Sequence, residues 1–113
     1  MKPKSKKASA DTAAAVDAFM VTLKHSHKPA IEALRRIIGG ADRSIAEGIK
    51  WNAPSFRTAE YFATTHLRAT NGVGIVLHLG AKVRAMVVFA GLDEVKAQAS
   101  ALRDIVRQWI KFV

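Results

Sequence analysis

The longest apolar stretch of the chain, residues 72–92, constrains the fold more than any other feature. It is long enough to suggest a membrane-spanning helix, but His78, Lys82 and Arg84 lie in its middle, where a bilayer makes charge costly. Within it, apolar side chains recur at every second position of residues 73–79, which is the period of a β-strand. We therefore predict two short strands joined by a polar turn, and no membrane segment.

Three other segments also have strand character. The alternation within residues 49–51 indicates a strand, which should end near Pro54 or lie at a sheet edge, because proline has no amide hydrogen for a sheet ladder. A second strand is expected at about residues 61–68. Residues 84–90 are apolar on both faces, so we expect the strand there to be central in the sheet or well covered.

Helices are expected on both sides of these strands. One helical pattern runs from about Asp11, which can cap its first turn, to Lys24, and a second begins near Pro29 and ends at residues 39–40. One long C-terminal helix is expected after Asp93. The order ααββββα predicts an α+β fold, in which an antiparallel sheet of four or more strands has its helices packed on one face.

Length and charge indicate one domain with a basic tail. The chain has 113 residues, which suits a single domain over residues 11–113. Its formal net charge is +9, and the first ten residues, expected to be disordered, hold no acid but several lysines: Lys2, Lys4, Lys6 and Lys7. Cysteine is absent, which excludes disulfides and thiolate metal sites and fits the reducing cytoplasm, where we expect the protein to reside.

Residues 48–56, GIKWNAPSF, form the most unusual stretch of the chain. Trp51 is two positions from Ile49, so both are expected to face the core, with Lys50 pointing to the opposite face. Phe56 is expected to close over the apolar pair. One interpretation is purely structural: a strand ends at a corner that is anchored by aromatic rings.

The other interpretation is a ligand site on this rigid corner. Rigid loops on a scaffold often carry binding groups, and the positive charge of the chain favours anions. We therefore expect a small anionic or polar ligand to be held by a group of side chains: Lys50, Trp51, Asn52, Ser55, Arg57 and His78.

Two histidines allow an alternative, a metal site. His66 and His78 flank a turn signal at residues 71–72, and a three-residue loop centred on Gly72 would pair them directly across two strands. A two-residue loop would instead send the two imidazoles to opposite faces. Even the paired arrangement needs a third ligand, and Glu60 is the only acid beside that strand.

Basic residues of the tail and of the last helix suit another partner, a polyanion. Several of them fall within about 80° of one another at roughly 100° per helical residue: Lys96, Arg103, Arg107 and Lys111. Together with the tail lysines they would bind nucleic acid weakly and without sequence specificity. A simpler explanation also holds, because cations stabilise the negative C-terminal end of a helix.

Catalytic signatures are not found in the sequence. It has no glycine-rich phosphate loop that opens a helix, no H-E-x-x-H and no G-x-S-x-G motif. Its nine acidic residues show no obvious acid–base pair. We predict a small non-catalytic binding module without a cofactor, which acts as a monomer or as a homodimer.

Five segments resemble one known family. They are EGIKWNAPSF, YFATTHLR, GVGIVLHLGAKV, RAMVVF and LRDIVRQWI, and through them residues 15–113 are similar to the YdhG-like domain family, a bacterial domain of unknown function. The resemblance implies an α+β fold with an antiparallel sheet covered by helices. One branch is described as frataxin-like iron chaperones, so the resemblance also implies iron binding. Iron prefers oxygen ligands, and the acids of the first helix, Asp11 and Asp17, point to different sides of it.

Overall fold

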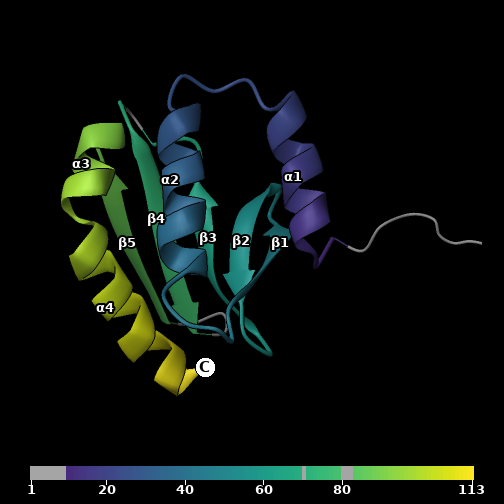
Figure 1. The fold of residues 1–113 in the computed structure, drawn as a ribbon, viewed down its shortest axis with the longest axis vertical. Coiled ribbons are helices and arrows are strands. Elements are labelled where there is room, and N and C mark those ends of the chain that lie inside the picture. Colours follow the sequence, from purple (N-terminus) through teal and green to yellow (C-terminus); the bar gives the residue numbers. More distant parts are fainter. Residues whose placement is uncertain (1–9, 70, 80–82) are drawn as a thin grey trace, which may run out of the picture.

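The structure, a computed structural model, describes residues 10–69, 71–79 and 83–113. Its centre is a five-stranded antiparallel sheet, in which the strands lie side by side in their chain order (Figure 1). The strands are β1 (Ala46–Lys50), β2 (Ala53–Arg57), β3 (Tyr61–His66), β4 (Val73–Leu79) and β5 (Val83–Phe89). The predicted α+β class is confirmed, with one strand more than the predicted order contains.

Helices cover one face of this sheet. They are α1 (Ala13–Thr22), α2 (Lys28–Gly39), α3 (Leu92–Ala97) and α4 (Ala99–Trp109), followed by a short 3-10 helix, η1 (Ile110–Phe112). Figure 1 shows α1 beside β1, α2 over the middle of the sheet, and α3 and α4 beside β5. Within the described ranges no helix lies on the other face, which we call the open face.

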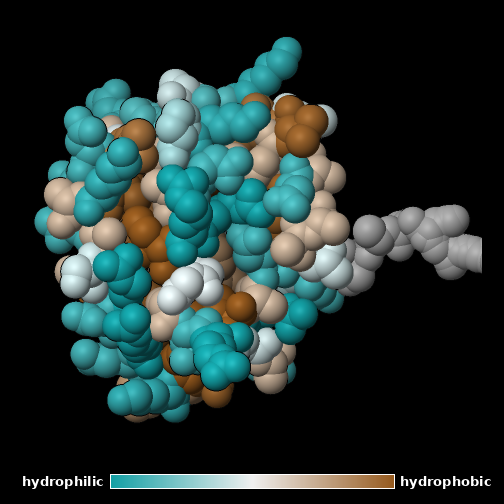
Figure 2. Space-filling view, in the orientation of Figure 1, coloured by the Kyte–Doolittle hydropathy of each residue, from teal (hydrophilic) through white to brown (hydrophobic). Residues whose placement is uncertain are grey.

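The core lies between the sheet and the helices. The alternation predicted for β4 directs Val73, Ile75 and Leu77 toward the helices, and all three are buried. They belong to one apolar cluster with Ile31 and Leu34 of α2. Figure 2 shows that the outer surface of the helices is mostly hydrophilic, with apolar side chains visible in the crevice between α2 and α4.

Strand β2 is the first departure from the predicted order. The strand at residues 49–51 was expected to end near Pro54 or to lie at a sheet edge. It is the edge strand β1 and ends at Lys50, whereas Pro54 lies at the second position of a further strand, β2, opposite Ile49. The pairing of β2 with β3 starts one residue later, at Ser55. The Thr65 hydroxyl of β3 donates a hydrogen bond to the Pro54 carbonyl at 2.8 Å, so a side chain satisfies this carbonyl ahead of the first residue pair of β2 and β3.

Strand β5 lies at the edge of the sheet, so the expectation of a central or well-covered strand is wrong. Residues 83–86 and Val88 are exposed. Because each strand pairs with its neighbours in the chain, the last strand has only β4 beside it. The apolar character of β5 therefore does not reflect a central position.

The terminal helices also differ from the prediction. The expected single C-terminal helix is divided at Gln98, whose φ of −99° and ψ of 9° separate α3 from α4. Helix α1 is capped by Thr12 instead of Asp11, since the Thr12 hydroxyl accepts a hydrogen bond from the amide of Ala15 at 3.1 Å. Of the predicted tail, only Ala10 is among the described residues. No helix in the described ranges combines the length and hydrophobicity needed to cross a membrane.

Candidate functional site

The turn between β1 and β2 holds Trp51 outside the core, so the expectation that its indole faces inward is wrong. Trp51 and Asn52 have φ values of 55° and 57°, as the two-residue turn of a tight hairpin requires. The strand alternation therefore ends at Lys50. The indole lies over the open face, and not on the core side where Ile49 is directed. Its side chain is 55% exposed. Phe56 is buried in the core as expected.

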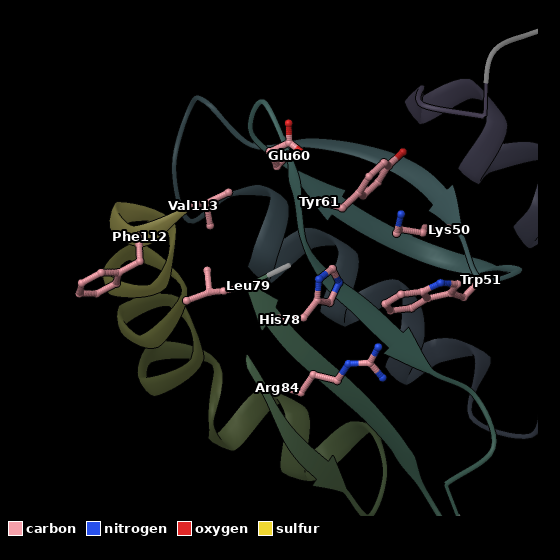
Figure 3. A pocket seen from close by; sticks show the side chains of 9 residues that line it. All are labelled: Lys50, Trp51, Glu60, Tyr61, His78, Leu79, Arg84, Phe112 and Val113. Atoms are coloured by element: carbon pink, nitrogen blue, oxygen red, sulfur yellow. The ribbon is translucent and has the colours of Figure 1, made fainter. Parts of the chain in front are cut away.

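The indole borders a hollow of about 500 Å³ at one end of the open face (Figure 3). The hollow is lined by Lys50, Trp51, Glu60, Tyr61, His78, Leu79, Arg84, Phe112 and Val113. These residues come from four strands, from the turns that hold Trp51 and Glu60, and from the C-terminal end of the chain. Figure 3 shows the His78 imidazole in the middle of the group, with Trp51, Tyr61 and Arg84 around it.

Two cations lie against the aromatic rings of this hollow. The Lys50 Nζ atom is 5.5 Å from the ring centroid of Trp51 and 5.4 Å from that of Tyr61. The guanidinium carbon of Arg84 is 5.3 Å from the Trp51 ring. These distances are within the range of cation–π attraction. In the described part of the chain neither cation forms an ion pair, and Glu60, which also lines the hollow, is not bonded to either.

The floor of the hollow is a buried polar row. His78 is buried beneath the Trp51 ring, with their ring centroids 5.0 Å apart and tilted by 51°. Its Nε2 atom lies 3.3 Å from the Thr64 hydroxyl, which in turn accepts a hydrogen bond from the Ser55 hydroxyl at 3.0 Å. Burial, and then the charges of Lys50 and Arg84, lower the pKa of His78 below its ordinary value. The imidazole is therefore neutral at physiological pH.

The predicted ligand-binding residues do not all meet in this hollow. Lys50, Trp51 and His78 line it, and Ser55 lies buried beneath it. Asn52 is exposed at the tip of the turn. Arg57 is directed elsewhere, since its Nη2 donates to the Asp11 carbonyl at 3.1 Å and its Nη1 to the Thr58 carbonyl.

Tyr61 and Arg84 also line the hollow, although neither was among the binding residues predicted from the sequence. Arg84 lies directly opposite His78 in the pairing of β4 with β5, so the correct register of that hairpin would have found it. Tyr61 donates a hydrogen bond to Asp11. Burial, and then this bond, raise the pKa of Tyr61 to about 12, so its hydroxyl stays protonated.

The structure does not pair the two histidines of the alternative metal site. His66 lies opposite Gly74, four residues from His78 along β4, so neither predicted register is present. That offset is roughly 13 Å along a strand. No group of three or more His, Asp or Glu side chains in the described ranges could hold a metal ion. Of the two acids considered for iron, Asp17 is bound by Arg35 at 2.7 Å and Asp11 by Tyr61.

The predicted basic ridge is interrupted by the break at Gln98. Lys96 lies on α3, whereas Arg103 and Arg107 lie on α4 and Lys111 on η1. The Arg107 side chain is partly engaged, since its Nε donates to the Ala41 carbonyl at 2.7 Å. The tail lysines of the same alternative lie outside the described residues: Lys2, Lys4, Lys6 and Lys7.

Comparison of the chain with protein-family models, with curated proteins and with solved structures finds no match in any of the three. The similarity to the YdhG-like domain family, and the iron role that it implies, therefore stay predictions.

Proposed function

We propose that the protein is a non-catalytic binding module for a small ligand that carries an anionic group. The ligand would occupy the hollow of the open face, with its anionic group between Lys50 and Arg84. The observation that carries this proposal is the pair of cations held beside one exposed indole without a carboxylate partner among the described residues.

Charge and shape both support an anionic ligand. Two cations close to a neutral, buried histidine raise the local positive potential, and an anion would relieve their mutual repulsion. Arg84 offers a planar fork of donors that suits carboxylates and phosphates, and Lys50 adds a second charged donor. The volume of about 500 Å³ fits a small organic molecule.

Binding without catalysis agrees with the polar row beneath the hollow. The Ser55 hydroxyl is fully buried and bonded to Thr64, so it is not presented as a nucleophile. The Nε2 atom of His78 is occupied by the Thr64 hydroxyl. These groups are placed to support the floor of a site instead of attacking a ligand.

Titration calorimetry with phenyl phosphate, and with phenol as the neutral comparison, tests the proposal. We expect saturable binding of phenyl phosphate that Lys50→Ala and Arg84→Ala each weaken by about tenfold or more, because a hydrogen bond to a charged group contributes roughly 1.5–3 kcal/mol. Lys24→Ala and Arg36→Ala are matched controls, since both side chains are exposed away from the hollow. Equal binding of phenol, or no effect of either change in the hollow, would refute the proposal.

The rival polyanion function predicts a different result. Binding of nucleic acid through the tail should fall steeply with salt and should weaken when residues 1–9 are deleted. Ala10 is kept in that deletion because its carbonyl accepts a hydrogen bond from Ile49. Binding of phenyl phosphate in the hollow should be unchanged by the deletion.

A further inference from the structure

The two edge strands of the sheet, β1 and β5, differ in what lies beside their outer backbone groups. At the β1 edge, the amide of Ile49 donates to the Ala10 carbonyl at 2.6 Å, and β1 carries the charged residues Glu47 and Lys50. At the β5 edge, no backbone segment of the described ranges pairs with the strand. An unpaired strand of seven residues is a template for another strand, and charged side chains normally protect such an edge.

The bare edge is apolar on both sides of the sheet. Met86 and Val88 are directed to the open face and are 55% and 49% exposed. On the helix side, Val87 shares a groove with Ile105 of α4, whose side chain is also exposed. The single charged side chain of the strand is Arg84. A partner strand must therefore offer apolar side chains on both of its faces.

We propose that β5 pairs with β5 of a second copy of this chain, so that the two sheets join across a two-fold axis into one continuous antiparallel sheet. This inference is independent of the proposed ligand. The second copy fits because β5 is itself apolar on both faces, as its partner must be. A register centred on Met86 pairs all seven residues of each strand.

This register also avoids a clash of like charges. Arg84 lies opposite Val88 of the partner subunit, and not opposite the second Arg84. Each Arg84 guanidinium lies over the Trp51 ring of its own subunit, so it also stays clear of the second Arg84.

The size of the edge indicates a weak dimer. The seven residues of β5 extend about 24 Å, and a sheet with one helix layer is about 20 Å thick. The edge therefore offers roughly 500 Å² per subunit, or about 1,000 Å² for both, which is near the lower limit of specific interfaces. We expect a dimer whose dissociation constant is in the micromolar range.

Cysteine cross-linking tests the partner and the register together, since the natural chain has no cysteine. In the proposed dimer the two Met86→Cys side chains face each other across the axis, at a Cα separation of about 5 Å that suits a disulfide. The matched control is Val88→Cys on the same face, whose two copies would lie roughly 13 Å apart along the strand. We expect the first variant to form a disulfide-linked dimer on mild oxidation and the second to stay largely uncrosslinked. Equal or reversed rates would overturn the proposal.

Analytical ultracentrifugation of the full chain provides the second test. We expect the natural protein to dimerise as its concentration rises through the micromolar range, and Met86→Lys to sediment as a monomer. Val21→Lys is the control, because Val21 is 79% exposed on α1 and far from the edge in the fold. A natural protein that stays monomeric at high micromolar concentration, or a Met86→Lys variant that dimerises as the natural protein does, would overturn the proposal.

Discussion

Trp51 has a backbone conformation that bulky residues seldom adopt. Its φ of 55° lies in the left-handed region, which costs roughly 1 kcal/mol for a residue with a side chain. The indole recovers part of this cost through its contacts with Lys50, Arg84 and the His78 ring. The side chain therefore contributes to the open face and not to the core.

The exposure of this indole predicts a small effect on stability. We expect Trp51→Ala to lower the free energy of unfolding by about 1 kcal/mol, because only cation–π and partial ring contacts are lost. Phe56→Ala is the comparison, and removal of this fully buried ring should cost about 3–5 kcal/mol. Urea denaturation of both variants measures the difference. A loss for Trp51→Ala as large as that for Phe56→Ala would show that the indole supports the core.

At the scale of elements, Gly48 allows β1 to pack beneath the start of α1. A Cβ atom at this position would lie 2.0 Å from the Tyr61 hydroxyl and 3.0 Å from the Ala10 carbonyl oxygen. These groups belong to β3 and to the segment before α1, so one missing side chain lets three parts of the chain meet. Glycine is needed here for space.

We expect Gly48→Ala to lower the free energy of unfolding by about 1–3 kcal/mol, because the new methyl group forces Tyr61 or the backbone at Ala10 to move. Gly39→Ala is the matched control. A Cβ atom at Gly39 meets nothing within 4 Å, and alanine in a helix gains up to about 1 kcal/mol over glycine. Thermal unfolding followed by circular dichroism should show a lower melting temperature for Gly48→Ala than for the natural protein, and a higher one for Gly39→Ala. Equal melting temperatures would contradict the steric account.

Local patterns predicted some elements well and others poorly for physical reasons. The alternation in β4 reflects its apolar residues on the helix side, Val73, Ile75 and Leu77, so the sequence alone revealed the strand. Pro54 concealed β2, although the proline comes before Ser55, the first residue of β2 that pairs with β3. The apolar pattern of β5 predicted a central or well-covered strand, since a sequence pattern cannot distinguish burial within a sheet from an exposed apolar edge.

At the scale of the whole molecule, Arg35 ties the two N-terminal helices to the sheet. It binds Asp17 of α1 at 2.7 Å, Glu32 of α2 at 2.9 Å and Glu47 of β1 at 2.7 Å. Hydrogen bonding to Glu47, more than to the other acids, raises the pKa of Arg35 above its ordinary value. The guanidinium is therefore always charged and holds three elements in register.

We expect Arg35→Met to lower the free energy of unfolding by about 3 kcal/mol, because it leaves the half-buried Glu47 without its partner beside two other acids. Arg36→Met, one position along α2, removes an exposed cation and should have little effect. Denaturation in urea measures the free energy of unfolding of both variants. Urea is preferred to guanidinium chloride, which is a salt and would screen the charges. A similar loss in both variants would show that the charge network is not what links the elements.

The candidate site could be predicted only in part, because it is assembled by the whole fold. Lys50 and His78 were found from their own segments, but the hollow also needs Tyr61 of β3, Arg84 of β5 and the C-terminal Phe112. Their proximity follows from strand register and from the path of α4, which no local pattern encodes. Arg57 is the converse case, since it is close in sequence but directed to Asp11.

The hydrogen bond between Ala10 and Ile49 limits how these molecules can associate through their strands. The Ala10 carbonyl already binds the Ile49 amide on the outer side of β1. An added strand would therefore find an unoccupied edge only at β5. In the proposed dimer, the pairing of β5 with β5 across a two-fold axis uses the unpaired edge strand of both molecules. Growth of that dimer into a filament would require pairing at β1, where Ala10 already binds the amide of Ile49.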